Sequence, residues 1–141
     1  MKVTRARTRL LRTPANNPHD NPLIVGVPPS SPTRAFVTLE LETDDGLQGI
    51  GYTFIPALRA SPLTPALKEA VDALSQMVVG EDPMPVEAIA CNLQEAAGGS
   101  GPGGLFALAL SAVDMALWDI KGKALGQSVC TLLGGYRDRA P

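Results

Sequence analysis

Residues 105–125 read LFALALSAVDMALWDIKGKAL, and this run decides the fold that we expect for the chain. Its apolar side chains recur at the three- and four-residue intervals of a helix, and Gly126 follows as a C-terminal cap. The apolar positions form one stripe and a second set that widens it: Leu105, Leu108, Ala112, Met115 and Ala116, with Ala109, Val113, Leu117 and Ile120. A helix that is apolar around most of its circumference is buried on more than one side. The rest of the domain is therefore expected to pack around it.

Two acidic residues stand out in this run. Asp119 and Lys123 are four residues apart, which predicts an ion pair worth roughly 0.2–0.5 kcal/mol if it is exposed. Asp114 lies inside the apolar part, where a carboxylate needs a hydrogen-bond or ion-pair partner. We expect Asp114 to tie the helix to a neighbouring backbone group or basic side chain.

Composition excludes several classes of protein. A chain of 141 residues with a net charge of −2 is consistent with one domain and offers no basic field for nucleic acid. No apolar run reaches the roughly 18 residues of a membrane span, and the basic start lacks the apolar segment of a signal peptide. Cys91 and Cys130 are too few for a disulfide framework. We interpret both as buried thiols of a cytoplasmic protein.

The sequence of the N-terminal half predicts a small antiparallel sheet. Residues 2–12 form a plausible first strand, and residues 35–43 alternate between apolar and polar side chains as a second strand. An Asp-Asp-Gly turn then leads into a third strand at 47–54. Gly49 and Gly51 indicate either a bulge in this strand or a close approach of another backbone.

The segment between the first two strands, residues 13–33, is rich in Pro and Asn and is expected to be a long loop. It holds the only histidine, His19, next to Asp20. The polar composition of the loop favours the interpretation that His19 and Asp20 are simply exposed to solvent. The functional alternative is that the loop forms a lid over a ligand. Residues 52–54 would stand at the end of the sheet, either as core or rim residues or facing a substrate.

Two amphipathic helices are expected between the sheet and the central helix. Thr64 and Pro65 open the first, and residues 85–97 form the second. Their apolar stripes are Leu67, Val71, Leu74 and Val78 in the first, and Val86, Ile89 and Leu93 in the second. The residues alone therefore predict an α+β domain. They specify no reaction, because zinc-ligand spacing and the Gly-x-Ser-x-Gly elbow of a serine hydrolase are both missing.

Several ordered motifs resemble one known family. Residues 111–126, read together with 132–135 and 137–138, resemble the signature of the mandelate racemase and muconate lactonizing enzyme family of the enolase superfamily. Residues 45–52 and 80–83 resemble its N-terminal domain in the same order. The resemblance runs from about Val3 to the last residue. One difference is that the family often has Pro where this chain has Ser128, itself a good N-cap.

The resemblance implies a three-stranded antiparallel β-meander followed by a bundle of three to four helices, as in the enolase N-terminal domain. Residues 1–135 would form this capping domain, and residues 136–141 would begin the linker or first strand of a TIM barrel. In the family, the barrel carries the Mg²⁺ ligands and the Lys or His bases that remove a proton next to a carboxylate. We therefore expect no catalytic or metal-binding residues in this chain. Mg²⁺ would belong to the full-length parent, a racemase, cycloisomerase or dehydratase of hydroxy acids or sugar acids.

In that family, the cap closes the active site with the loop after the first strand and with the end of the hairpin. Carried onto this sequence, the substrate-binding candidates are His19 and Asp20 in the loop, and Tyr52, Thr53 and Phe54. They would exclude water and select a small carboxylate substrate. The expected partners are a C-terminal TIM barrel and further copies in a homo-oligomer. The alternatives are a stand-alone acid-binding module and a self-associating interaction domain.

Overall fold

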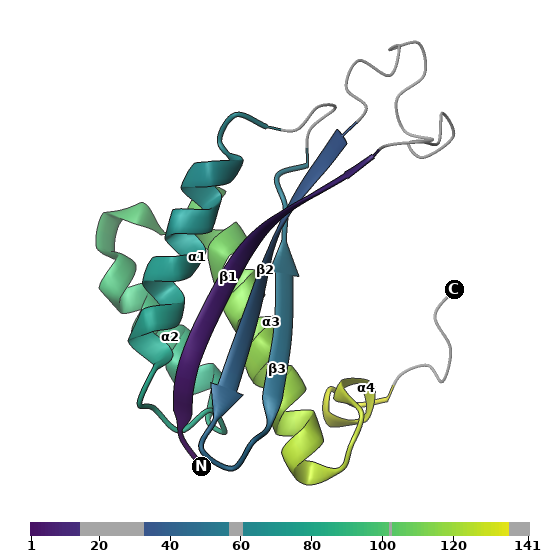
Figure 1. Cartoon of the computed structure of the whole chain (residues 1–141). Helices are drawn as coiled ribbons and strands as arrows, with labels where there is room; N and C mark the ends of the chain where they lie inside the picture. Colours follow the sequence, from purple (N-terminus) through teal and green to yellow (C-terminus); the bar gives the residue numbers. More distant parts are fainter. Residues whose placement is uncertain (15–32, 57–60, 102, 136–141) are drawn as a thin grey trace.

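The computed structural model describes residues 1–14, 33–56, 61–101 and 103–135 (Figure 1). Three strands are followed by helices, which confirms the predicted α+β class: β1 (Val3–Pro14), β2 (Thr33–Thr43), β3 (Gln48–Thr53), α1 (Thr64–Val78), α2 (Val86–Ala97), the 3₁₀ turn η1 (Gly98–Ser100), α3 (Gly104–Leu125) and α4 (Val129–Leu132). Within these residues, no helix combines the length and the apolarity needed to cross a membrane.

The strands form one antiparallel meander in the order β1-β2-β3. Pro14 at the end of β1 lies opposite Thr33 at the start of β2, and Thr53 at the end of β3 lies opposite Val37. Because of this register, β1 ends, β2 begins and β3 ends at the same end of the sheet. The opposite end holds the tight turn between β2 and β3, where Gly46 has a φ of 85°.

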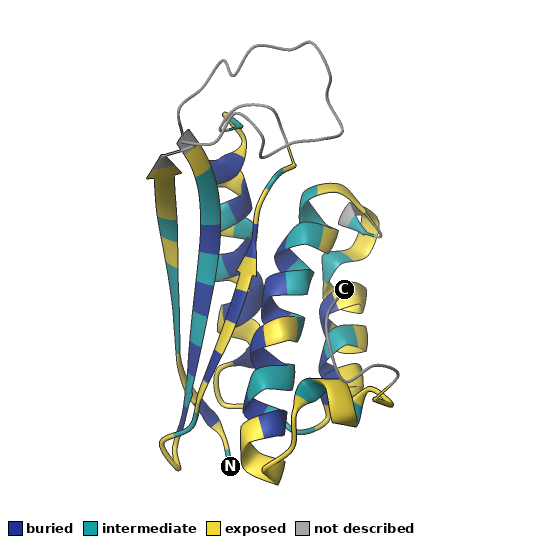
Figure 2. Cartoon of the chain, turned by 90° about the vertical axis from the view of Figure 1, so that its right-hand side faces the viewer, coloured by how far each residue is buried: buried dark blue, intermediate teal, exposed yellow. Residues whose placement is uncertain are grey.

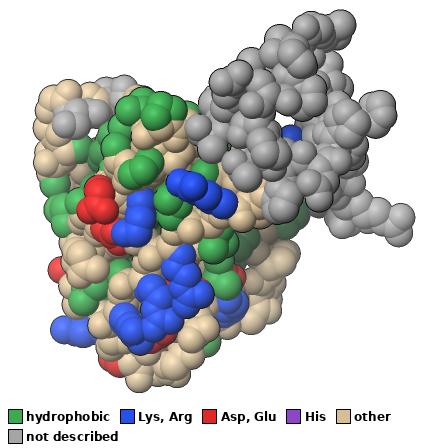
Figure 3. Space-filling model, turned by 45° about the horizontal axis from the view of Figure 1, so that its top comes forward, with side chains coloured by type: hydrophobic (Ala, Val, Ile, Leu, Met, Phe, Trp, Pro, Cys, Tyr) green, Lys and Arg blue, Asp and Glu red, His purple; other side chains and the backbone are tan. Residues whose placement is uncertain are grey.

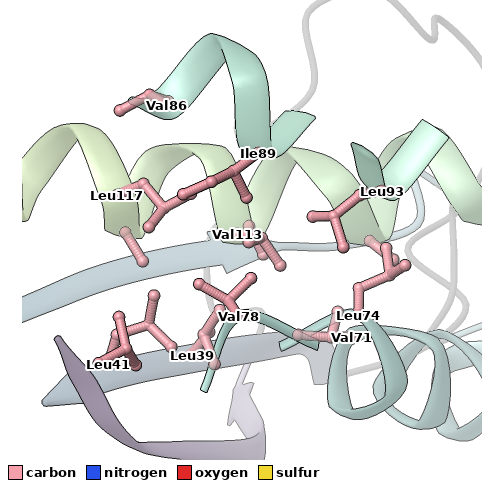
Figure 4. Close-up of a cluster of buried hydrophobic side chains, with 14 of the residues drawn as sticks. Leu39, Leu41, Val71, Leu74, Val78, Val86, Ile89, Leu93, Val113 and Leu117 are labelled. Carbon is pink, nitrogen blue, oxygen red and sulfur yellow. The ribbon is translucent and has the colours of Figure 1, made fainter. Parts of the chain in front are cut away.

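The helices cover one face of the sheet and leave the other face open (Figures 1 and 2). Helices α1 and α3 pack on the strands, and α2 packs on α3. Buried side chains fill the space between the two layers (Figures 2 and 4). They come from alternate positions of β2 and from the predicted stripes of the helices: Val37, Leu39, Leu41, Leu67, Val71, Leu74, Val78, Val86, Ile89, Leu93, Val113, Leu117 and Ile120.

Two glycines in β3 allow α3 to lie directly on the strand. A Cβ atom at Gly51 would lie 1.8 Å from the carbonyl oxygen of Ala112, and one at Gly49 would lie 2.1 Å from that of Ala116. The pairing of β3 with β2 runs without a bulge. Of the two expectations for these glycines, the close approach of another backbone is confirmed.

The predicted pair of Asp119 and Lys123 is confirmed, and it also fastens α3 to the outer edge of β3. Lys123 Nζ lies 2.8 Å from Asp119 Oδ2 and donates a second hydrogen bond to the carbonyl oxygen of Gln48 at 2.7 Å. The backbone N–H of Ile50 donates to Asp119 Oδ2 at 2.9 Å. Since β3 is an edge strand, these side chains satisfy backbone groups that would otherwise invite pairing with another chain.

Three residues expected to be buried are exposed: Met115, Cys91 and Cys130. Met115 lies away from the sheet, because α3 turns its alanines towards β3. Cys91 lies two positions after the buried Ile89 and so falls on the opposite side of α2. Cys130 belongs to α4, a helix of four residues that buries none of them. The two cysteines do not form a disulfide with each other.

Asp72 connects α1 to the first strand. Its carboxylate accepts hydrogen bonds from the hydroxyl of Thr8 on β1 and from Lys68 one turn earlier in α1. Burial opposes ionisation of Asp72, but the hydrogen bonds from Lys68 and Thr8 outweigh it and hold its pKa below the usual 3.8.

Replacing Asp72 with Asn is therefore expected to lower stability at neutral pH by roughly 1 kcal/mol, a value reduced because the group is partly exposed. A carboxylate whose pKa is lower in the folded state stabilises the fold above its unfolded pKa, and this contribution disappears as pH falls through the folded pKa. Urea unfolding at about pH 7 and about pH 3 should show the difference between variant and wild type shrinking at the lower pH. A difference that is equal at both pH values would contradict this account.

Candidate functional site

The open face of the sheet ends in an apolar patch at the end where β1 and β3 finish. The rings of Phe36 and Phe54 lie 5.6 Å apart between centroids and are tilted by 59°. Leu11 on β1 is paired with Phe36 on β2. Tyr52 on β3 is paired with Thr38, which lies two residues after Phe36 on β2. Leu11, Tyr52 and Phe54 are exposed, and Phe36 is half-buried. These four residues are called the apolar patch below.

Towards the other end of the open face, β1 and β2 carry charged side chains. Arg5 on β1 lies 3.9 Å from Glu42 on β2, and Arg7 and Arg9 lie 3.8 Å and 3.6 Å from Glu40. Figure 3 shows Lys and Arg side chains gathered on this side of the molecule. Exposed ion pairs of this kind contribute little stability. Their effect is to make one end of the face charged and the other apolar.

The predicted site residues fall into three groups. Tyr52, which is 51% exposed, and Phe54 both belong to the apolar patch. Thr53 lies between them but is only 4% exposed, because alternate side chains of a strand point to opposite faces and its own points towards the helices. His19 and Asp20 lie outside the described residues. The segment that carries them leaves the sheet after Pro14 and returns at Thr33, at the same end as the apolar patch.

Away from the sheet, a groove of about 700 Å³ lies between α2, α3 and α4. Its wall is mostly apolar and includes two carboxylates: Glu87, Ala90, Gln94, Ala107, Leu110, Ser111, Asp114, Met115, Trp118, Val129 and Leu133. Sequence reasoning did not find this groove. The available signal was the spacing of Asp114, Met115 and Trp118, which puts all three on the side of α3 away from the sheet.

Asp114 has a different partner from the one expected. Its carboxylate is half-buried and accepts a hydrogen bond from Trp118 one turn later, so the partner is neither a backbone group nor a basic side chain. Burial raises the pKa of Asp114, the negative charge of Glu87 raises it further, and the hydrogen bond from Trp118 acts in the opposite direction. The ammonium of Lys121 lies 4.9 Å from the centre of the Trp118 ring.

The described residues do not fit a metal centre. Among them, no group of three or more His, Cys, Asp or Glu side chains is placed to hold a metal ion. The Mg²⁺ that the family resemblance implies therefore has no ligand set in this part of the chain.

Comparison with known proteins places the chain. Residues 8–134 match the family model for the N-terminal domain of mandelate racemase / muconate lactonizing enzyme. The chain is 38% identical over 135 residues to D-galactarolactone cycloisomerase from Agrobacterium fabrum, covering 96% of this chain and 32% of the relative. It is 41% identical over 102 residues to D-galactonate dehydratase from Xanthomonas axonopodis pv. citri, covering 72% of this chain and 25% of the relative. The chain thus spans about a third or less of these relatives.

Comparison with solved structures agrees with this family match. The fold superposes on L-talarate dehydratase from Polaromonas sp. JS666, solved with Mg and L-glucarate, with a TM-score of 0.80 and 29% identity over 97% of this chain and 36% of that one. The match covers the strands and helices described above. The chain therefore belongs to the mandelate racemase / muconate lactonizing enzyme family, and it corresponds to the N-terminal domain of that family.

Proposed function

We propose that the chain is the substrate-capping domain of a Mg²⁺-dependent enzyme that removes a proton next to the carboxylate of a sugar acid or hydroxy acid. The observation that carries this proposal is the meeting of three features at one end of the sheet: the apolar patch, the junctions at Pro14 and Thr33, and the end of β3. The names of the relatives support the substrate class, since they act on galactonate, talarate or a galactarolactone.

Within this proposal, the end of β3 and the segment between β1 and β2 close over the substrate. Tyr52 and Phe54 supply exposed aromatic surface that excludes water, and His19 and Asp20 supply polar contacts that select the acid. Thr53 anchors the two aromatic residues, because its side chain is buried against the helical layer. Exclusion of water strengthens every charge interaction inside a closed site.

Catalysis would belong to a C-terminal TIM-barrel domain that also holds the Mg²⁺, and the 141-residue chain would have no activity alone. Homo-oligomerisation and a cytoplasmic location are parts of the same proposal. The first test is the intact mass of the polypeptide in its source cells. A species heavier by roughly the 250 residues of a barrel is expected. A species near 14.7 kDa would instead favour an acid-binding module or a self-associating domain.

Replacing Tyr52 with Ala in a full-length parent should raise the KM for the acid substrate by about tenfold, the effect of losing roughly 1.4 kcal/mol of binding. Mg²⁺ affinity and thermal stability should stay unchanged, because the side chain is exposed and lies on the cap. Ile50→Ala is the matched control, since Ile50 is exposed on the same face of β3 but two residues further from the sheet end. Loss of Mg²⁺ binding in the Tyr52 variant would contradict the capping role.

A further inference from the structure

Strand β3 carries residues that the proposed cap directs at the substrate, but it has few side chains that hold the strand itself in place. Its inward positions are Gly49, Gly51 and Thr53, so Thr53 alone supplies a side chain to the core between the sheet and the helices. Tyr52 and Phe54 are exposed and add little to that core. Glycine also leaves the backbone more conformational freedom than any other residue. The position of the two aromatic residues therefore depends on what holds the backbone of β3.

The backbone groups of β3 alternate between β2 and the outer edge of the sheet. The N–H of Thr43 donates to the carbonyl oxygen of Leu47 at 2.9 Å, so these residues form a hydrogen-bonded pair next to the turn. Hydrogen-bonded and non-hydrogen-bonded pairs alternate along an antiparallel ladder, so Gly51 and Thr53 direct their N–H groups towards β2. Ile50 is out of step by one residue and directs its N–H outward. Contacts on both edges thus hold the strand.

Asp119 and Lys123 of α3 hold the outer edge of β3, and they are called the α3 clamp below. Asp119 Oδ2 accepts the N–H of Ile50 at 2.9 Å, and Lys123 Nζ donates to the carbonyl oxygen of Gln48 at 2.7 Å. The two side chains also bind each other at 2.8 Å. Within these two elements, whose residues are all described, no other side-chain hydrogen bond joins β3 to α3. The clamp therefore supplies the polar contacts that fix the strand along the helix.

We propose that Asp119 and Lys123 are positioning residues, which fix β3 on α3 so that Tyr52 and Phe54 stand in place at the end of the sheet. This role rests on the proposed capping function, since it matters for activity only if the two aromatic residues contact a substrate. Side chains that are in place before a ligand binds do not have to be ordered during binding, which lowers the cost of closing over the substrate. The clamp acts through the strand and touches no substrate itself.

Amide hydrogen exchange of the 141-residue chain, followed by NMR in wild type and in Asp119→Ala, tests this role. The informative amides are those of Gly51 and Thr53, because they point towards β2 and lose protection when β3 opens. Their exchange should accelerate by about tenfold or more in the variant, the effect of losing one hydrogen bond to a charged group. The nuclear Overhauser contact between the rings of Phe36 and Phe54, whose centroids lie 5.6 Å apart, should weaken as well.

Three further variants make the result specific. Asp119→Asn keeps an oxygen that accepts the N–H of Ile50, so it should restore most of the protection. Lys123→Met loses the bond to Gln48 but keeps an apolar stem, so it should give a smaller acceleration even if Asp119→Ala does not fold. Asp72→Asn is the matched control, because it weakens a bond of the same kind between α1 and the opposite edge strand, β1. It should leave the two informative amides close to wild type, and equal accelerations in Asp72→Asn and Asp119→Ala would overturn the proposal.

Kinetics of a full-length parent separate the clamp from the capping function. Asp119→Ala should raise the KM for the acid substrate by about threefold and leave kcat within a factor of about two, because it weakens binding without touching the reacting groups. Asp72→Asn should leave both constants unchanged. If Tyr52→Ala raises KM and Asp119→Ala does not, the positioning role is wrong and the capping function stands. If neither variant changes KM, the capping function is the part that fails, because the exchange measurement tests the clamp independently.

Discussion

Replacing Gly51 with Ala is expected to destabilise the domain by about 3 kcal/mol or more, at the upper end of the cost of overpacking. The new methyl group would lie 1.8 Å from the carbonyl oxygen of Ala112 and 2.8 Å from its carbonyl carbon. Both atoms belong to the backbone of α3, so no side-chain rotation can relieve the contact. The helix would have to move away from β3, and buried contacts along its length would be lost.

Gly99→Ala is the matched control, because a Cβ atom there meets nothing within 4 Å. Its stability should stay within about 0.5 kcal/mol of wild type. Both variants lose the same backbone freedom in the unfolded chain, an effect of about 0.4–1 kcal/mol that favours alanine. The difference in stability between the two variants therefore measures the steric contact of the new methyl group with the backbone of α3. Urea unfolding followed by circular dichroism measures it, and equal midpoints for the two variants would show that α3 does not lie directly on β3.

The order of the elements and most of their ends could be predicted because local chemistry determines them. The exceptions are β1, which continues to Pro14, and β2, which begins at Thr33; each strand is two residues longer at this end than expected, because the two pair with each other there. The apolar stripes of α1 and α2, the turn before β3 and Gly126 after α3 all have short-range signatures. The glycines of β3 illustrate what a sequence leaves open. Gly49 and Gly51 signalled a close approach or a bulge, but that α3 is the element approaching depends on the packing of distant segments.

The partner of Asp114 could not be predicted for the same reason. A carboxylate in an apolar run signals a need for a partner, yet the partner proved to be Trp118 on the same helix. The groove around it depends on how α2 and α4 cross α3, which no local pattern specifies. The hairpin end was located correctly, but the inward orientation of Thr53 required the register of β3 against β2.

Replacing Leu74 with Asp is expected to leave the domain unfolded at room temperature. Leu74 is 8% exposed and lies in the core between α1 and the layer formed by α2 and α3 (Figure 4). An unpaired carboxylate at this position costs more than about 4 kcal/mol, which is comparable with the whole stability of a marginal domain of about 5 kcal/mol. The far-UV circular dichroism spectrum should lose its helical signal, and no cooperative melt should remain.

Met77→Asp is the control that separates the cost of burying a carboxylate from the cost of placing Asp in a helix. Met77 lies on the same helix, three residues later, and is 50% exposed. The same substitution there should keep the helical spectrum and a cooperative melt. Leu74→Ala provides a graded test, with an expected loss of about 2–5 kcal/mol from the cavity that it leaves. If Leu74→Asp and Met77→Asp melted alike, the stripe of α1 would not face the core. The packing of α1 against the sheet depends on that stripe, so the whole two-layer arrangement is tested by this pair of variants.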